Sequence, residues 1–140
     1  MQDQEPTSPN AAPIVLVVDD DKNCRELCAQ YLRVSGFSVS EAHNGNQALS
    51  MAMERPPSLV ITDLALPGID GYALARKLRA QRSTATLPIL AITGRGEFMS
   101  DAARALAAGC NAFLPKPFSL DRLLEEVERL LEQGERLPAR

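Results

Sequence analysis

The stretch LVITDLALPG, residues 59–68, decides the fold. It opens with apolar and β-branched residues, which is typical of a buried strand. The run stops at Asp63, and a Pro67-Gly68 turn follows. The stretch IVLVVDDD, residues 14–21, has the same form. Two strands that end in carboxylates predict a shared acidic pocket at the edge where open α/β sheets hold their ligands.

Composition bounds the class of protein. The chain has 140 residues, 45% of them hydrophobic, and a net charge of -3 from 15 basic and 18 acidic residues. This length and composition predict one domain with a buried core. No apolar segment reaches the roughly 18 residues of a membrane span, and the polar N-terminus lacks signal-peptide features. Without a dense Lys/Arg run, we expect no nucleic-acid partner, no membrane partner and a cytoplasmic location.

Cysteine and histidine usage excludes several kinds of site. The cysteines are Cys24, Cys28 and Cys110, and the one histidine is His43. An odd count without a CxxC pair argues against a disulfide framework and a zinc site, so buried, reduced thiols are expected. A single histidine also cannot build a histidine-based metal site.

Apolar runs alternate with helical stripes along the chain. We expect strands at 14–18, 37–42, 59–62, 87–93 and 112–114. We expect helices at 22–34, 46–54, 71–82 and 98–108, and a last one capped by Ser119 and ended by Gly134. The apolar stripes include Leu27 in the first helix and Leu106 in the fourth. A flexible arm (1–13) and a short tail (134–140) would flank one domain at 14–133.

Five repeats of strand and helix predict a doubly wound α/β fold. Helices then cover both faces of a parallel sheet, which gives a three-layer sandwich with right-handed crossovers. The flavodoxin-like strand order 2-1-3-4-5 fits the length. In that order the first and third strands are neighbours, so Asp19, Asp20 and Asp63 come together.

The expected strand ends carry chemistry suited to phosphate. Thr93 ends the fourth strand and Lys116 follows the fifth, on the same rim as the three aspartates. Clustered carboxylates favour a hard cation such as Mg²⁺, and a metal with a lysine and a hydroxyl can hold a phosphoryl group. A carboxylate nucleophile could accept that group. Taken singly, Thr93 and Lys116 are unremarkable surface or strand-end residues, and Asp21 is better explained as a helix cap than as a ligand.

Together these motifs resemble the receiver domain of two-component response regulators. The resemblance covers about residues 14–133 and rests on VVDDD at 17–21, DLALPGIDG at 63–71, TG at 93–94 and KPF at 116–118. It implies that Asp63 is the phosphoryl acceptor. Asp20 would bind Mg²⁺ directly, Asp19 would hold it through water, and the backbone carbonyl of Ala65 would complete the metal ligands.

The resemblance also implies a switch. Thr93 would bond the phosphoryl group, Lys116 would pair with it, and Phe113 would be the switch aromatic. The Lys116-Pro117 bond is expected to be cis. Phe113 lacks a hydroxyl, so an output through an aromatic hydroxyl is not expected. Ala65 and Arg95, each two residues beyond an implied site residue, are hypothesised to set the lifetime of the phosphorylated state.

The predicted function is therefore a phosphorylation switch in a two-component phosphorelay. A sensor histidine kinase or histidine phosphotransferase would donate the phosphoryl group, and helix 4, strand 5 and helix 5 would form the responding surface. That surface would act on a downstream protein, pass phosphate onward or support a homodimer, and no output domain is expected. We expect no turnover enzyme. A phosphatase, for which Ala65 replaces the usual second acid, and a degenerate docking scaffold are the alternatives.

Overall fold

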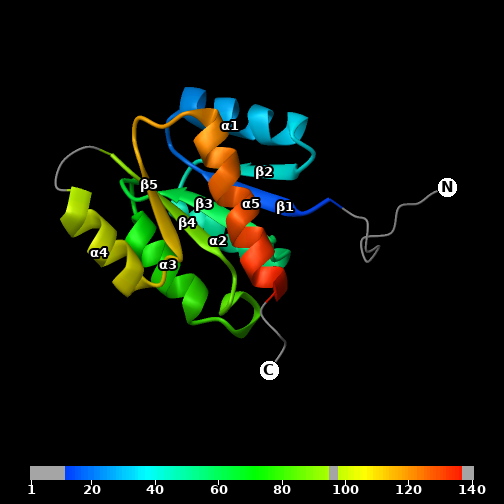
Figure 1. Cartoon of the computed structure of the whole chain (residues 1–140). Helices are drawn as coiled ribbons and strands as arrows, with labels where there is room; N and C mark the ends of the chain where they lie inside the picture. Colours follow the sequence, from blue (N-terminus) through cyan, green and yellow to red (C-terminus); the bar gives the residue numbers. More distant parts are fainter. Residues whose placement is uncertain (1–11, 95–97, 137–140) are drawn as a thin grey trace.

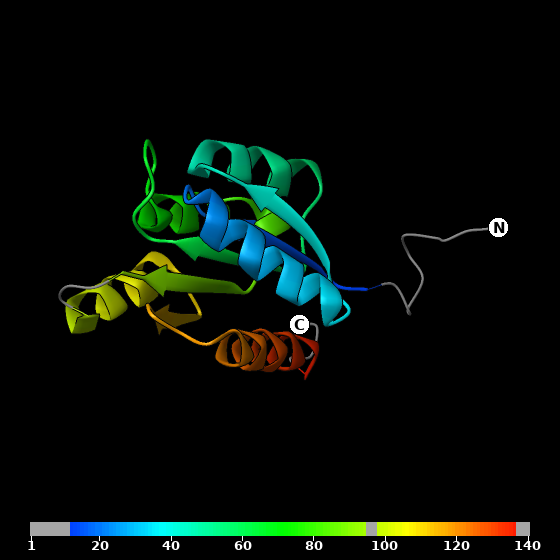
Figure 2. The ribbon, with the colours of Figure 1, turned by 90° about the horizontal axis from the view of Figure 1, so that it is seen from above.

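A five-stranded parallel sheet forms the centre of the computed structural model, which describes residues 12–94 and 98–136 (Figure 1). The strands are β1 (Ile14–Val18), β2 (Ser38–Ala42), β3 (Leu59–Asp63), β4 (Ile89–Thr93) and β5 (Ala112–Pro115). They lie in the order β2-β1-β3-β4-β5, which can be followed from top to bottom in Figure 2. The predicted order 2-1-3-4-5 is confirmed.

Helices cover both faces of the sheet, as predicted. They are α1 (Lys22–Val34), α2 (Gly45–Glu54), α3 (Gly71–Arg79), α4 (Phe98–Ala108) and α5 (Leu120–Arg136), with a short 3₁₀ turn η1 (Arg82–Thr84). Alternate strand residues face opposite layers because strand side chains have a period of two. Val15 and Val17 pack with α1 and α5, whereas Leu16 and Val18 pack with α2, α3 and α4.

Side-chain caps fix where the helices begin and end. The Asp21 carboxylate accepts a hydrogen bond from the Asn23 N–H (3.1 Å), so its predicted role as a helix cap is confirmed. The Ser119 hydroxyl accepts from the Arg122 N–H (3.0 Å), which confirms the predicted cap of α5. At the end of α1, Gly36 has φ +107°, a conformation that glycine adopts without strain.

Three element boundaries differ from the sequence prediction by two or more residues, and four others differ by one. α3 stops at Arg79 instead of residue 82, because the Leu78 carbonyl accepts from the Gln81 N–H (3.2 Å) and the Thr84 hydroxyl (2.5 Å) and not from a further helical turn. β4 begins at Ile89, after Pro88, which has no N–H for the sheet. α5 continues to Arg136, past Gly134, since one glycine costs a helix only about 1 kcal/mol. The domain limits at 14–133 stay a prediction, and the predicted arm falls mostly outside the described residues.

The sequence prediction misplaced two leucines. Leu27 is 56% exposed and Leu106 is 51% exposed, whereas the neighbouring Ala29 and Ala105 are fully buried. Small alanines let both helices pack close to the sheet, which rotates the larger side chains outward. The cysteines are free, and Cys28 and Cys110 are buried as predicted, whereas Cys24 is only half-buried. Within the described ranges, no helix combines the length and apolar character needed to cross a membrane.

Candidate functional site

The carboxyl ends of four strands meet at one rim, as the sequence predicted. Val18 pairs in register with Thr62, which places Asp19 beside Asp63. Across β3 and β4, Asp63 pairs with Ile92, and Thr93 then pairs with Pro115, directly before Lys116. Sheet geometry alone thus gathers residues that lie up to 97 positions apart in the chain.

Lys116 lies between the two buried acids of this rim. Its Nζ is 2.8 Å from Asp63 Oδ2 and 4.0 Å from Asp19 Oδ2. The other carboxylate oxygen of Asp63 accepts a hydrogen bond from the Ala65 N–H (2.9 Å). One cation and one backbone dipole therefore hold the Asp63 carboxylate in a fixed orientation while it is only 6% exposed. The Lys116-Pro117 peptide bond is cis, as expected.

Asp19 is held from several directions at the end of β1. Its N–H donates to the Ala42 carbonyl (3.1 Å), its carbonyl accepts from Arg25 (2.9 Å), and its Oδ1 accepts from the Asp21 N–H (2.9 Å). Its neighbour Asp20 is exposed. The acidic loop thus presents one buried, oriented carboxylate and one that faces solvent.

The pKa values of Asp19 and Lys116 are both raised, which favours the neutral form of the acid and the charged form of the lysine. Burial raises the pKa of Asp19 above its ordinary value of 3.8, against the hydrogen bonds from Asp21 and Cys24 and the charge of Lys116. Burial alone would lower the pKa of Lys116, but the hydrogen bond from Lys116 to Asp63 and the charges of both acids outweigh it and raise the pKa. Lys116 is therefore a charged ammonium at neutral pH, and Asp19 is a carboxylate that would gain from a cation.

Thr93 is fully buried, and its hydroxyl has no hydrogen-bond partner within the part of the chain that the structure describes. Buried hydroxyls are usually paired, so an orphaned one at a rim of charged groups needs an explanation. An acceptor that enters the site would supply the missing bond. This is the position where the sequence predicted a phosphoryl-binding hydroxyl.

The predictions for the remaining site residues have different outcomes. Ala65 is exposed, and its backbone N–H is the donor to Asp63. Phe113 on β5 is half-buried and packs against the core layer of α2, α3 and α4. Arg95 lies outside the described residues. The roles of Ala65, Phe113 and Arg95 in switching and lifetime stay predictions.

The acids do not form a closed metal cage. Among residues 12–94 and 98–136, no three His, Cys, Asp or Glu side chains converge closely enough to hold an ion. Mg²⁺, however, is usually bound by one or two carboxylates and keeps several waters. Asp19 and Asp63, which share Lys116, are therefore a suitable oxygen donor set for this ion.

Sequence reasoning missed Arg25 and Glu41. Both side chains are largely buried, at 15% and 26% exposed, and they form an ion pair (3.2 Å) beside the acidic loop. The signal was present in α1, because residues 25, 28, 29 and 32 follow the i, i+3, i+4, i+7 spacing of a buried stripe. Arg25 thus occupies a core-facing position.

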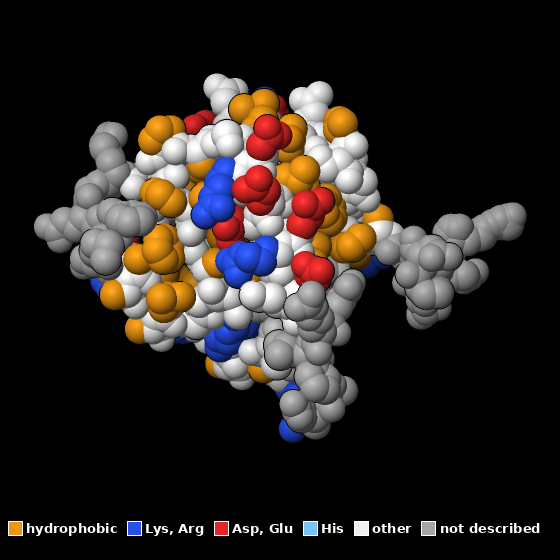
Figure 3. Space-filling view, in the orientation of Figure 1, with side chains coloured by type: hydrophobic (Ala, Val, Ile, Leu, Met, Phe, Trp, Pro, Cys, Tyr) orange, Lys and Arg blue, Asp and Glu red, His pale blue; other side chains and the backbone are white. Residues whose placement is uncertain are grey.

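Acidic and basic side chains gather over α5, as Figure 3 shows. Glu126 is 6% exposed and lies between Arg122 (3.1 Å) and Arg129 (2.6 Å), on the same helix. These charges are already paired within α5, so they give no direct support for pairing across a homodimer. The predicted dimer through α4, β5 and α5 stays a prediction.

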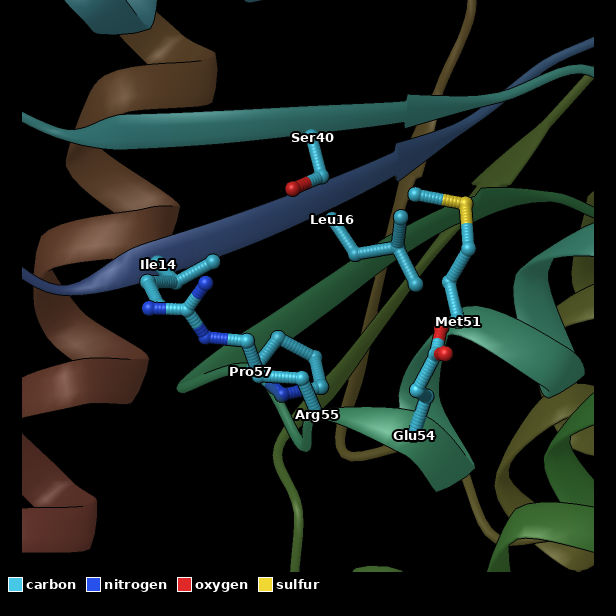
Figure 4. Close-up of a pocket in the computed structure, with 7 residues that line it drawn as sticks. All are labelled: Ile14, Leu16, Ser40, Met51, Glu54, Arg55 and Pro57. Carbon is cyan, nitrogen blue, oxygen red and sulfur yellow. The ribbon is translucent and has the colours of Figure 1, made fainter.

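A cavity of about 190 Å³ lies near the amino ends of the strands, away from the rim (Figure 4). Ile14, where β1 begins, and Pro57, which precedes β3, line it together with Leu16, Ser40 and Met51. These are the amino ends of the strands, so the cavity is separate from the rim that carries the acids. No group in it belongs to the candidate site.

The chain is similar to response regulators in sequence. Residues 15–128 match the family described as response regulator receiver domain. The chain is 42% identical over 120 residues to the response regulator MprA of Mycobacterium avium, covering 85% of this chain and 51% of that protein. It is 32% identical over 126 residues to the "DNA-binding dual master transcriptional regulator RpaA" of Synechocystis, covering 90% and 52%. The chain thus spans about half the length of these relatives, and the prediction that it has no output domain is untested.

Solved structures agree with the sequence matches. A putative response regulator from Chloroflexus aurantiacus superposes with a TM-score of 0.83 at 37% identity, covering 86% of this chain and 98% of that one. The chemotaxis response regulator CheY4 of Vibrio cholerae gives 0.81 at 27% identity, covering 86% and 99%. The chain therefore belongs to the response regulator receiver domain family of two-component signalling.

Proposed function

We propose that this receiver accepts a phosphoryl group on Asp63 from a phosphohistidine of a sensor histidine kinase or a histidine phosphotransferase. One observation carries the proposal. The Asp63 carboxylate is oriented by the Lys116 ammonium at 2.8 Å and the Ala65 N–H at 2.9 Å, on the rim where the buried hydroxyl of Thr93 has no partner among the described residues. An anchored carboxylate, a cation and an unused donor are what a phosphoryl acceptor needs.

Asp19, Asp20, Asp63 and the Ala65 carbonyl would hold Mg²⁺. When bound, the ion would neutralise charge on the oxygens of the transferring phosphoryl group. The raised pKa of Asp19 supports this role, because its buried carboxylate lacks full compensation from the protein alone. Asp20 is exposed, so its carboxylate is accessible to an ion from solvent.

In the transfer step, a carboxylate oxygen of Asp63 forms a bond to phosphorus as the bond from phosphorus to the donor imidazole breaks. The imidazole nitrogen leaves with the electron pair of that bond. Lys116 stays protonated, moves its hydrogen bond toward the phosphoryl oxygens and neutralises part of their charge. No proton needs to leave Asp63, because it attacks as a carboxylate.

The phosphoryl group would then bias the rest of the domain. Thr93 donates its hydroxyl to a phosphoryl oxygen, and Phe113 turns toward the space that Thr93 vacates. The change reaches the surface of α4, β5 and α5, which contacts a downstream protein or a second copy of the chain. Ala65 and Arg95 set how long the state lasts. The chain acts as a switch and not as a turnover enzyme, because no acid stands at position 65 to assist repeated hydrolysis.

The test is site-specific phosphorylation. Wild-type protein incubated with acetyl phosphate and Mg²⁺ should gain one acid-labile phosphate, located on Asp63 by mass spectrometry, and Asp63→Asn should gain none. Asp21→Asn is the matched control. It removes a carboxylate from the same rim but keeps the helix cap, since Asn caps as well as Asp, and it should label normally. Full labelling of Asp63→Asn would overturn the proposal.

A further inference from the structure

A largely buried arginine lies under the acidic loop. The Nε of Arg25 is 3.2 Å from Glu41 Oε1, and its NH1 donates to the backbone carbonyl of Asp19 at 2.9 Å. The Arg25 side chain is 15% exposed and Glu41 is 26% exposed, so solvent screens this pair less than a surface ion pair. One guanidinium thus joins α1, the end of β2 and the first acid of the site.

These contacts fix the backbone of Asp19 on both sides. Its N–H is held by Ala42 on β2 (3.1 Å), where Val18 and Ala42 are register partners. Its carbonyl is held by Arg25, and this carbonyl belongs to the peptide group that leads into Asp20. The guanidinium therefore sets the peptide plane between Asp19 and Asp20, and with it the direction in which both carboxylates leave the chain.

Arg33 offers a comparison within the same helix. Its NH1 is 3.3 Å from the other carboxylate oxygen of Glu41, and its NH2 donates to the Val39 carbonyl (2.9 Å). Arg33 therefore shares the acid with Arg25 and carries the same charge. Its described hydrogen bonds go to β2 and none reaches the Asp19 carbonyl. Loss of either arginine removes one positive charge and one contact to Glu41, but only loss of Arg25 releases the acidic loop.

We propose that Arg25, oriented by Glu41, is a positioning residue that sets the Mg²⁺ affinity of the acidic pair Asp19 and Asp20. The inference rests on the proposed function for the identity of the ion. Groups that orient metal ligands commonly contribute 10- to 100-fold to metal affinity. Here Arg25 holds the peptide group between Asp19 and Asp20, the two proposed ligands, and does not bind either carboxylate.

Loss of a positioning contact and loss of a positive charge should change the Mg²⁺ affinity in opposite directions. Removal of a nearby cation alone strengthens Mg²⁺ binding, because the site becomes more negative. Removal of a positioning contact weakens it, because the carboxylates must be ordered when the ion binds. Arg25→Met should therefore weaken Mg²⁺ binding by about 10-fold or more, whereas Arg33→Met should leave it unchanged or slightly tighter.

The experiment is a Mg²⁺ titration of the full chain, followed by isothermal calorimetry and by amide chemical shifts, with thermal unfolding recorded for each variant. Glu41→Gln should weaken binding less than Arg25→Met, because Arg25 loses its anchor but keeps the carbonyl contact. Arg25→Lys should be intermediate, since one ammonium cannot span both partners as the guanidinium does. These two milder variants keep the test decisive if Arg25→Met fails to fold.

The outcomes separate this inference from the proposed function. Wild-type affinity in Arg25→Lys and Arg25→Met, or equal weakening in Arg25→Met and Arg33→Met, would overturn the positioning role. Failure of wild-type protein to label on Asp63 would overturn the proposed function instead. The calorimetric comparison of the arginine variants does not depend on phosphorylation and would still decide the inference.

Discussion

The ends of β1 and β4 both bury a polar side chain, but they differ in whether its polar atoms have hydrogen-bond partners. At the end of β1, the N–H, the carbonyl and the carboxylate of Asp19 all have partners within the protein. At the end of β4, Thr93 is equally buried, but its hydroxyl has no partner among the described residues. The first strand end is assembled before any ligand arrives. The end of β4 carries a hydroxyl donor that an acceptor from outside the described protein would have to pair.

This difference has an energetic meaning. An unpaired buried hydroxyl costs the protein about 1–3 kcal/mol, which is regained when an acceptor enters. A hydroxyl that is already paired offers no such gain. Under the proposed function, Thr93 would therefore contribute free energy to switching, while the β1 end would provide fixed geometry for the ion.

The largest predicted effect concerns the backbone at the end of β3, which lies between these two strand ends. A Cβ at Gly71 would lie 2.5 Å from the Asp63 carbonyl oxygen and 2.7 Å from the Leu64 Cα, both backbone atoms that cannot rotate away. Gly71→Ala should therefore destabilise the domain by about 3 kcal/mol. The measurement is urea unfolding followed by far-UV circular dichroism.

Gly94, which follows Thr93, is the matched control. A Cβ there meets no described atom within 4 Å. Gly94→Ala should change the free energy of unfolding by less than about 0.5 kcal/mol. Equal stability of the two variants would mean that the backbone behind Asp63 is not held as tightly as the structure indicates.

Much of the fold followed from the sequence because strand ends are local signals. The alternation of strands and helices predicted the sheet and its order, and the runs that stop at Asp63 and Thr93 predicted the rim, since parallel strands place their carboxyl ends together. Residues whose roles depend on distant partners were missed. From the sequence, Arg25 resembles a surface residue, because its partner Glu41 comes from β2. Leu27 resembles a core residue, but α1 packs against the sheet through Ala29 and leaves Leu27 exposed. Periodicity indicates that a stripe exists but does not show which of its apolar residues face the core.

The second prediction tests the incomplete side of the comparison. Thr93→Val keeps the shape and removes the orphaned hydroxyl, so the resting domain should become more stable by about 1 kcal/mol. The gain in unfolding temperature on addition of beryllofluoride and Mg²⁺ should shrink, because the acceptor no longer finds a donor. Differential scanning calorimetry with and without the phosphoryl mimic measures both effects.

Thr62→Val provides a control of the opposite sign. Thr62 is also fully buried, but its hydroxyl donates to the Asp63 carbonyl at 2.9 Å. Removal of this bonded hydroxyl should destabilise the resting domain by about 1 kcal/mol. If Thr93→Val destabilises by the same amount, the Thr93 hydroxyl has a partner in the resting state, and the contrast between the two strand ends is lost.

The smallest predicted effect concerns pH at the β1 end. Burial raises the pKa of Asp19 above 3.8, so the folded state holds this proton more tightly than the unfolded state does. The contribution of Asp19 to the free energy of unfolding therefore falls as pH rises from about 4 through the raised pKa, and it is constant above that pKa.

Asp19→Asn should remove this fall, because the amide has no charge to desolvate and its oxygen can still accept from the Asp21 N–H. The variant should match wild type below about pH 4 and exceed its stability at neutral pH without Mg²⁺. Saturating Mg²⁺ should reverse the order, since only wild type keeps the ligand. Unfolding curves from pH 3.5 to 8, with and without Mg²⁺, test both signs. A variant that is less stable than wild type without Mg²⁺ at neutral pH would show that Lys116 compensates the Asp19 charge in full, so that the β1 end is complete without an ion.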